Sequence, residues 1–567
     1  MSGDDCTDDT AGPKTDPEEG VSRSDEAATE QVDDVAGNLK DPPTDGADEA
    51  DEADEADVAG FTWRRDTPEM TGSLEVVVAL VAPIGSPTTK VYEILARAFR
   101  ANDYTPELIQ ISEILDLALK TPKRDRNSDR WTRLMNKGDK LRKRYNDQAA
   151  AALMAAIAIN KSRRAQAGAA SNRHLHVSII RSLKREEEVR VLRQIYGERL
   201  IVIGISTPEL QRRKMVEKTL RRDFNPSKAK ALAARLIERD EDDEVTASGQ
   251  RVRDAFEQCD AYLSGRPTEI QTDAVRVVEL LLGQPWSTPL RDEQGMYHAH
   301  AAMFRSSAAG RQVGAAIVDD LGEVVAVGCN DVPRPHGGQF WPGDDKDRRD
   351  FRLATDANDA GKFDAVRELL TGLARSGWLT RSYEKLDDEE RAELALVKAG
   401  PLGGTRVRNL IEFGRILHAE MAALMTSARE GRPVRGCTLY TTTYPCHECM
   451  RLIIGSGIRR VVYIDPYPKS LAAELFDEMI GETVSPEIVQ VVPFTGVAPR
   501  LFPRVFELSN RAKDLRGTYM DWTDKSLRTI NPEFSSSIVA QEEAAIEYMG
   551  RRRAADDTSE TPADRKN

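Results

Sequence analysis

Three potential metal ligands and one carboxylate stand in two short stretches of the chain. His418 and Glu420 belong to the sequence His-Ala-Glu, and Cys446 and Cys449 belong to Pro-Cys-His-Glu-Cys. A catalytic zinc ion takes three protein ligands and keeps its fourth position open for water. We therefore expect His418, Cys446 and Cys449 to bind Zn²⁺. Glu420 is left over as a group that takes a proton from the water.

This combination is typical of zinc-dependent nucleobase deaminases, in which the glutamate is the general acid and base. A structural zinc site is the main alternative, and it needs a fourth protein ligand. His447 lies between the two cysteines, but a turn that brings both sulfurs together directs His447 away from them. Because a carboxylate remains unused, the pattern favours catalysis. It predicts attack of water on a cytosine ring with release of ammonia.

The surrounding elements must bring these residues together. Residues 417–429 are rich in Ala, Met and Leu and predict a helix that carries the histidine and the glutamate. Residues 436–442 predict a strand that leads to the cysteines, 449–454 a helix and 459–464 a second strand. This order indicates a β-α-β unit with two parallel strands. Upstream, residues 312–328 predict a hairpin.

Residues 303–330 resemble the opening of deoxycytidylate deaminases, and the two ligand stretches complete the resemblance. The resemblance implies that Asn330 contacts the sugar or the base of a nucleotide. Tyr444, just before Pro445, is the candidate stacking surface for the base. Polar residues that match the family before its first strand are Arg305, Ser306, Arg311 and Gln312. Ordinary capping and turn formation is the alternative explanation for these side chains.

The wider layout resembles the anti-phage dCTP deaminases of bacteria, which are two-domain proteins that destroy the deoxycytidine nucleotide pool during infection. The resemblance covers residues 74–519. It implies that dCTP and dCMP are deaminated to uracil nucleotides and that the role is antiviral defence. It also makes Lys469 and Arg500 candidates for contact with the substrate phosphates. A solvated lysine and a structural arginine are equally good explanations.

The N-terminal half predicts a parallel sheet of its own. Residues 74–81 form a continuous apolar run that suits a central strand, and a tight loop and a helix follow. Strand, loop and helix are the context of a phosphate-binding P-loop. Pro87 and Thr88 stand where that motif has Gly and Lys, so we expect a degenerate loop without hydrolysis. The candidate nucleotide-binding residues are Gly85, Ser86, Thr88, Thr89 and Lys90.

The predicted fold class is α/β. It combines an N-terminal parallel sheet of the P-loop NTPase or nucleoside-kinase type with a C-terminal cytidine-deaminase-like α/β/α sandwich. The predicted parts are an acidic disordered tail (1–68), a P-loop-like regulatory domain (69–245), linker helices (246–290), the deaminase domain (291–525) and a largely disordered C-terminal tail (526–567). The basic run 212–230 suggests a kinase-like lid, although a solvated helical face explains it as well.

Composition supports this plan. The first 60 residues hold 21 Asp and Glu against 3 Lys and Arg, an excess larger than the net charge of −14 of the whole chain. The acidity therefore belongs to the tail, which we expect to be disordered. Six cysteines give no disulfide framework, and no apolar stretch is long enough to span a membrane, so we expect a cytoplasmic protein without membrane contact.

The expected ligands are Zn²⁺ and deoxycytidine nucleotides, with ATP, GTP or another nucleotide at the N-terminal domain. A regulatory nucleic acid or phage factor and a homo-oligomer complete the expected partners. Three other functions stay open: a housekeeping dCMP deaminase, a nucleic-acid-editing deaminase and a non-catalytic nucleotide sensor. An editing enzyme needs a groove with aromatic and basic residues interleaved, whereas aromatic residues make up only 6% of this chain. A complete ligand set with Glu420 argues against the sensor.

Overall fold

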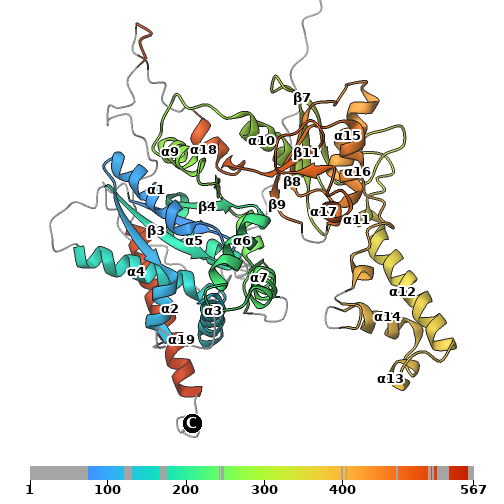
Figure 1. The fold of residues 1–567 in the computed structure, drawn as a ribbon, viewed down its shortest axis with the longest axis horizontal. Coiled ribbons are helices and arrows are strands. Elements are labelled where there is room, and N and C mark those ends of the chain that lie inside the picture. The colour runs from blue at the N-terminus through green and yellow to red at the C-terminus, as the bar shows by residue number, and fades with distance from the viewer. Residues whose placement is uncertain are drawn as a thin grey trace, which may run out of the picture. The chain divides into compact units, whose positions relative to one another are not determined.

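The computed structural model describes residues 75–119, 130–166, 175–241, 243, 248–397, 400–403, 405–467, 470–507, 513, 516–519 and 536–559. Within these residues the strands form two six-stranded sheets (Figure 1). The fold is therefore α/β, as predicted. The predicted acidic tail (1–68) and Lys469 lie outside the described residues.

The first sheet has the strand order β12-β5-β4-β1-β3-β2. Its five longer strands are parallel, and the short β12 pairs with β5 in the antiparallel sense. A parallel N-terminal sheet agrees with the sequence prediction. The strands are β1 (Val76–Val81), β2 (Thr105–Gln110), β3 (His176–Leu183), β4 (Leu200–Ser206), β5 (Ala261–Ser264) and β12 (Gly496–Val497).

Helices cover both faces of this sheet. All six residues of β1 are buried, and alternate residues enter two different cores, one shared with α1 and α9 and the other with α4 and α5. Burial on both faces explains the continuous apolar run of β1. The helices around this sheet are α1 (Thr88–Ala101), α2 (Ile111–Leu119), α3 (Arg130–Tyr145), α4 (Ala150–Gln166), α5 (Glu186–Tyr196), α6 (Glu209–Leu220), α7 (Pro226–Glu241), α8 (Val252–Glu257), α9 (Ile270–Leu281), α18 (Phe502–Phe506) and α19 (Ser536–Ser559).

Two segments of the chain around this sheet differ from the sequence prediction. Residues 246–290, expected to be linker helices, contain the strand β5, whose four residues are all buried in the first sheet. Residues 526–567, expected to be largely disordered, contain α19, which contacts α4. Glu542 of α19 is buried and accepts hydrogen bonds from Tyr196 Oη at 2.9 Å and Asn160 Nδ2 at 3.0 Å. The small alanine side chains of α19 and α4 allow this close packing.

The second sheet has the order β10-β11-β9-β8-β6-β7. The β6–β7 hairpin is antiparallel, as predicted, and β8 and β9 form the predicted parallel pair. β6 joins the hairpin to the β8–β9 pair, because β6 also pairs with β8 in the antiparallel sense. The strands are β6 (Gly314–Val318), β7 (Val324–Cys329), β8 (Thr438–Thr443), β9 (Arg460–Asp465), β10 (Ile480–Gly481) and β11 (Val489–Pro493).

Helices lie on both faces of the second sheet as well, which agrees with the predicted α/β/α layers. α10 packs against one face, and α15 and α16 pack against the other. No helix in the described ranges is both long enough and apolar enough to cross a membrane. Between β7 and α15 lies an insert that contains the helices α11 (Asp350–Leu353), α12 (Ala357–Arg375), α13 (Arg381–Glu384) and α14 (Asp388–Leu396). The other helices of this part are α10 (Arg291–Met303) before β6, α15 (Ala419–Arg429) before β8, α16 (His447–Ser456) between β8 and β9, and α17 (Ala472–Leu475) after β9.

Candidate metal centre and active site

Two helix N-termini carry the predicted metal ligands. His418 is the N-cap residue of α15 and Cys446 is the N-cap residue of α16, and both have extended backbone angles. Cys449, in the first turn of α16, donates its backbone N–H to Cys446 Sγ at 3.5 Å. The positive end of a helix dipole favours a thiolate at such a position. Helix geometry therefore presents one imidazole and two sulfurs to the same point.

The three side chains meet closely enough to share one ion. Their ligand atoms all lie within 4.8 Å of one another. His418 Nδ1 lies 3.2 Å from Cys446 Sγ and 3.3 Å from Cys449 Sγ. His447 does not belong to this group. One nitrogen and two sulfur donors suit zinc with an open fourth position, so the residues fit the predicted ion.

The electrostatics favour an ionised sulfur at Cys446. A hydrogen bond with the Cys449 thiol lowers the pKa of Cys446 to about 4, and the neighbouring His418 acts in the same direction. The hydrogen bond with Cys446 in turn raises the pKa of His418. A thiolate is the form of cysteine that binds metal. The neighbouring side chains therefore favour the thiolate form of Cys446.

Glu420 lies in the first turn of α15 and is 4% exposed. Its Oε1 lies 3.0 Å from Thr441 Oγ1 on β8, and its Oε2 lies 3.3 Å from Cys449 Sγ. Burial raises the pKa of this carboxyl above its ordinary value. A raised pKa brings a carboxyl closer to neutrality, where a group that takes and returns a proton works best. The catalytic role of Glu420 stays a prediction.

A cavity of about 540 Å³ opens onto this cluster. Its walls include His418, Glu420 and Cys446, together with the predicted residues Asn330 and Tyr444. This volume lies within the range of small-molecule sites. The structure therefore brings the metal ligands, the carboxylate and two of the predicted substrate contacts to one cavity.

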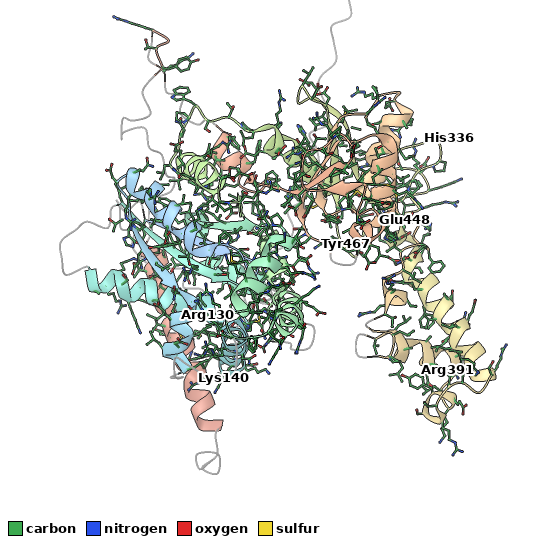
Figure 2. The ribbon with its side chains drawn as sticks, in the orientation of Figure 1. Arg130, Lys140, His336, Arg391, Glu448 and Tyr467 are labelled. Carbon is green, nitrogen blue, oxygen red and sulfur yellow. The ribbon has the colours of Figure 1, made fainter. Side chains whose placement is uncertain are left out.

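Two tyrosines, Tyr444 and Tyr467, line this cavity. The ring of Tyr444 meets Tyr463 edge-on, with centroids 4.9 Å apart. Burial raises the pKa of Tyr444 to about 12, so its hydroxyl stays protonated at neutral pH. Tyr467, labelled in Figure 2, also lines the cavity. Tyr444 is partly exposed at this wall, and its stacking against a base stays a prediction.

The side chain of Asn330 holds the neighbouring backbone. Its Nδ2 donates to the carbonyl of Arg311 at 2.7 Å, and its Oδ1 accepts from Val313 N at 2.6 Å. Ser306 donates its hydroxyl to the carbonyl of Asn330, and Gln312 donates its amide to the carbonyl of Ser306. These hydrogen bonds are of the capping and turn-forming kind that was the alternative explanation for these polar side chains. Contact between Asn330 and substrate stays a prediction.

Two of the predicted substrate contacts, Arg305 and the phosphate candidate Arg500, lie elsewhere. Arg305 donates to Gln339 Oε1 at 2.9 Å and stacks over the ring of Trp341, and it does not line the cavity. Arg500 is exposed and does not line the cavity either. The arginines that do line it are Arg253, Arg311 and Arg415. Sequence reasoning missed Arg253 because it lies in the segment interpreted as a linker, far from the ligands along the chain.

The predicted nucleotide-binding loop lines a second cavity of about 480 Å³ next to the first sheet. Gly85, Ser86, Thr88 and Thr89 contribute to its wall. Lys90 does not, since its ammonium group is exposed and lies 3.5 Å from the carbonyl of Pro267. The structure therefore brings four of the five predicted nucleotide-binding residues to this cavity and leaves Lys90 outside it.

Comparison with known proteins bears on the second sheet. Residues 290–465 match the family described as the cytidine and deoxycytidylate deaminase zinc-binding region. This match confirms the predicted zinc-binding deaminase region. It includes both ligand stretches, the β6–β7 hairpin and the insert between them. Arg253 and the first sheet, apart from β12, precede the matched residues.

The curated relatives match short parts of the chain. Deoxycytidylate deaminase of Enterobacteria phage T2 is 41% identical over 54 residues, 10% of this chain and 29% of that protein. ComE operon protein 2 of Bacillus subtilis is 39% identical over 70 residues, 12% and 37% respectively. Human deoxycytidylate deaminase is 39% identical over 76 residues, 13% and 42%. The chain thus spans less than half the length of these relatives.

Among solved structures, the dCMP deaminase from the cyanophage S-TIM5 in complex with dCMP and dUMP is similar to part of this chain. The two are 17% identical, and the similarity covers 37% of this chain and 99% of the phage protein, with a TM-score of 0.21. The tRNA:A34 deaminase structure is 18% identical and covers 36% of this chain and 95% of the other, with a TM-score of 0.17.

Proposed function

We propose that this protein is a zinc-dependent hydrolytic deaminase of deoxycytidine nucleotides. The observation that carries the proposal is the convergence of His418, Cys446 and Cys449 with the buried carboxylate of Glu420 at one cavity. A structural zinc site does not need such a carboxylate. The family match of residues 290–465 supports the same reaction class.

The residues divide the chemistry between them. His418, Cys446 and Cys449 would hold the ion, which supplies a Lewis acid that acidifies water when it is bound. Glu420 takes one proton from the water and delivers it to the ring nitrogen N3, and it then takes the second proton from the oxygen added at C4 and delivers it to the leaving amino group. Water adds to C4 of cytosine and ammonia departs, so the net reaction is hydrolysis. The hydroxyl of Thr441 fixes the carboxylate from the side of β8.

The cavity also supports a nucleotide rather than a free base or nucleoside. Arg253, Arg311 and Arg415 contribute guanidinium groups to its wall, and guanidinium is well suited to phosphate oxygens. We propose dCTP as the main substrate and dCMP as a second one. We propose further that loss of the deoxycytidine pool serves anti-phage defence, which rests on the resemblance described for residues 74–519.

Ammonia release from four substrates separates the candidate functions. The purified full chain is incubated with dCTP, dCMP, cytidine or single-stranded DNA. We expect release from dCTP and dCMP. Release from dCMP alone would favour a housekeeping enzyme, and release from DNA alone an editing enzyme. Zinc binding without release from any substrate would favour a nucleotide sensor.

A pair of variants on the same helix tests the mechanism. Glu420→Gln is expected to lower the rate by a factor of about 100 to 10,000 while zinc content stays unchanged. Glu430→Gln, at the exposed C-terminal end of α15, is the matched control and should leave the rate unchanged. Full activity of Glu420→Gln would refute the assigned role. The cellular role is tested by nucleotide profiling of infected cells, in which dCTP should fall only with active enzyme.

A further inference from the structure

The second cavity lies where parallel sheets place ligand sites. The connection from β1 through α1 leads to β2 on one side of β1, and the connection from β3 through α5 leads to β4 on the other side. α1 and α5 belong to the two opposite cores of the sheet. β1 and β3 therefore flank the point where the winding direction reverses. Ligands of open α/β sheets bind beyond the carboxyl ends of the strands at such a point.

Among the described residues, the charged side chains that line this cavity are mostly positive. Arg130, Arg142, Arg181 and Lys184 line it, against the two carboxylates Glu188 and Asp240. Lys184 and Asp240 pair with each other at 2.8 Å, and Arg142 and Glu188 lie 3.5 Å apart. Both of these cations are thus balanced within the wall. The positive excess comes from Arg130 and Arg181.

Arg181 is the cation best placed to take an anion. Its guanidinium donates to Thr89 Oγ1 at 3.1 Å and to Gln110 Oε1, which are both neutral groups. Burial and the nearby Arg130, labelled in Figure 2, lower the pKa of Arg181, and the carboxylate of Glu113 opposes this shift only in part. Two guanidinium groups that repel each other at a cavity wall are stabilised by an anion between them. Thr89 belongs to the first turn of α1, whose positive dipole end favours the same charge.

Two polar atoms of the same wall have no hydrogen-bond partner among the described residues. One is Oε1 of Gln250, which is 7% exposed, and the other is the hydroxyl of Ser86. Buried polar atoms are nearly always satisfied, and a ligand with a hydrogen-bond donor would supply the partner that Gln250 Oε1 accepts from.

Part of the wall is apolar. Trp131, Leu134, Met135, Ile111, Leu115 and Met215 contribute to it. A ligand that contacts both kinds of lining residue combines negative oxygens with a flat or apolar body. Nucleoside phosphates have this chemistry. The volume of about 480 Å³ is within the usual range for such ligands.

A short segment connects this cavity with the deaminase cavity. Arg142 Nε donates to the carbonyl of Ser248 at 2.7 Å, and Gln250 lines the second cavity. Arg253 and Asp254, a few residues later in α8, line the deaminase cavity. Glu257 at the end of α8 forms an ion pair with Arg311 of the same cavity. A ligand that contacts Gln250 therefore acts on a segment that also forms the wall around the proposed substrate.

We propose that the cavity beside α1 is a regulatory site for a nucleoside phosphate, and that residues 248–257 transmit its occupancy to the deaminase cavity. The binding part is independent of the proposed function, whereas the transmission part rests on it. Hydrolysis of the ligand is not expected, because Pro87 and the turned-away Lys90 leave the loop without its usual phosphate contacts.

Binding is measured first, on the full chain carrying Glu420→Gln. Calorimetry uses ATP, GTP, tripolyphosphate and adenosine as probes. We expect at least one of the two nucleotides to bind, adenosine to bind weakly, and Arg181→Ala to weaken nucleotide binding by a factor of about 10 to 100. Arg213→Ala, an exposed arginine on α6 that does not line the cavity, is the matched control. Gln250→Leu provides a second variant in the wall, and thermal unfolding confirms that each variant is folded.

Deamination of dCMP by the wild-type chain is then followed with and without the nucleotide that binds. We expect its rate to change at least threefold, and the change to disappear in Arg181→Ala but not in Arg213→Ala. Absence of nucleotide binding, or equal binding by folded Arg181→Ala and Gln250→Leu, would overturn the site. Binding with an unchanged deamination rate would overturn the transmission. A chain that binds nucleotide but deaminates nothing would refute the proposed function and leave the site intact.

Discussion

Replacing Thr441 with valine tests whether Glu420 must be held in place for proton transfer. Thr441 is fully buried on β8, and its Oγ1 lies 3.0 Å from Glu420 Oε1 and 3.0 Å from the carbonyl of Thr443. Valine has the same shape but lacks the hydroxyl. The substitution therefore removes this contact with the carboxylate without opening a cavity.

The size of the effect follows from this hydrogen bond. A hydrogen bond to a charged group contributes about 1.5–3 kcal/mol. If the bond is needed in the transition state, its loss lowers kcat by a factor of about 10 to 150. KM should change less than twofold, because Thr441 is not part of the cavity wall. Zinc content should stay at the wild-type level, since the three ligands are unchanged.

The assay is steady-state ammonia release from dCTP and dCMP, combined with metal analysis of each protein. Thr442→Val is the matched control. Thr442 is the next residue on β8, is buried, and accepts from Gly314 N at 3.2 Å rather than contacting Glu420. A kcat of Thr441→Val within twofold of the wild type, or an equal loss in Thr442→Val, would refute the reasoning.

Three further perturbations have defined outcomes. Burial raises the pKa of Asp292, but hydrogen bonds from Arg460 and Tyr440 outweigh burial and hold this pKa below its ordinary value of 3.8. The ionised carboxylate therefore contributes its full stabilisation above pH 3.8, and this contribution is lost as the pH falls below that value. Asp292→Asn should accordingly destabilise the fold by about 1–3 kcal/mol at pH 7 and by less near pH 3, as measured by urea unfolding. Glu293→Ala should cost about 3–5 kcal/mol in the same assay, because the fully buried carboxylate accepts from Arg276 and from Val497 N; a loss below 1 kcal/mol would contradict this. Removal of zinc by a chelator should abolish ammonia release and lower Tm, and added zinc should restore both.

The metal centre was predictable from the sequence because residue type and spacing determine it. A ligand pair in a C-x-x-C turn converges whatever the rest of the chain does. The helix boundary was less predictable: residues 417–429 were expected to be helical, whereas α15 begins at Ala419. The difference arises because His418 is the N-cap residue and keeps an extended backbone. The ligand lies just before the helix rather than within it.

The arginines of the cavity could not be predicted in the same way. Arg253 reaches the site only because α8 packs against α5 and contacts β9, a tertiary contact that leaves no local pattern. Arg305 stood next to family-like residues, but its guanidinium is occupied by Gln339 and Trp341. Similarly, α19 has no strong apolar stripe, and its burial depends on the alanines of α4. Long-range packing decided each of these cases.

Because β12 pairs with β5, the zinc-binding region cannot be separated from the first sheet without breaking strand pairs. After β11 the chain returns to the first sheet, where Gly496 pairs with Tyr262 and Val497 with Ala261. A fragment that contains only residues 290–465 would lack β12, and it would also lack Arg253 of the cavity wall. Transplanting the zinc-binding region onto another protein would therefore expose the apolar faces that these elements cover. Gene truncation or domain shuffling at either boundary would have to carry both sheets together.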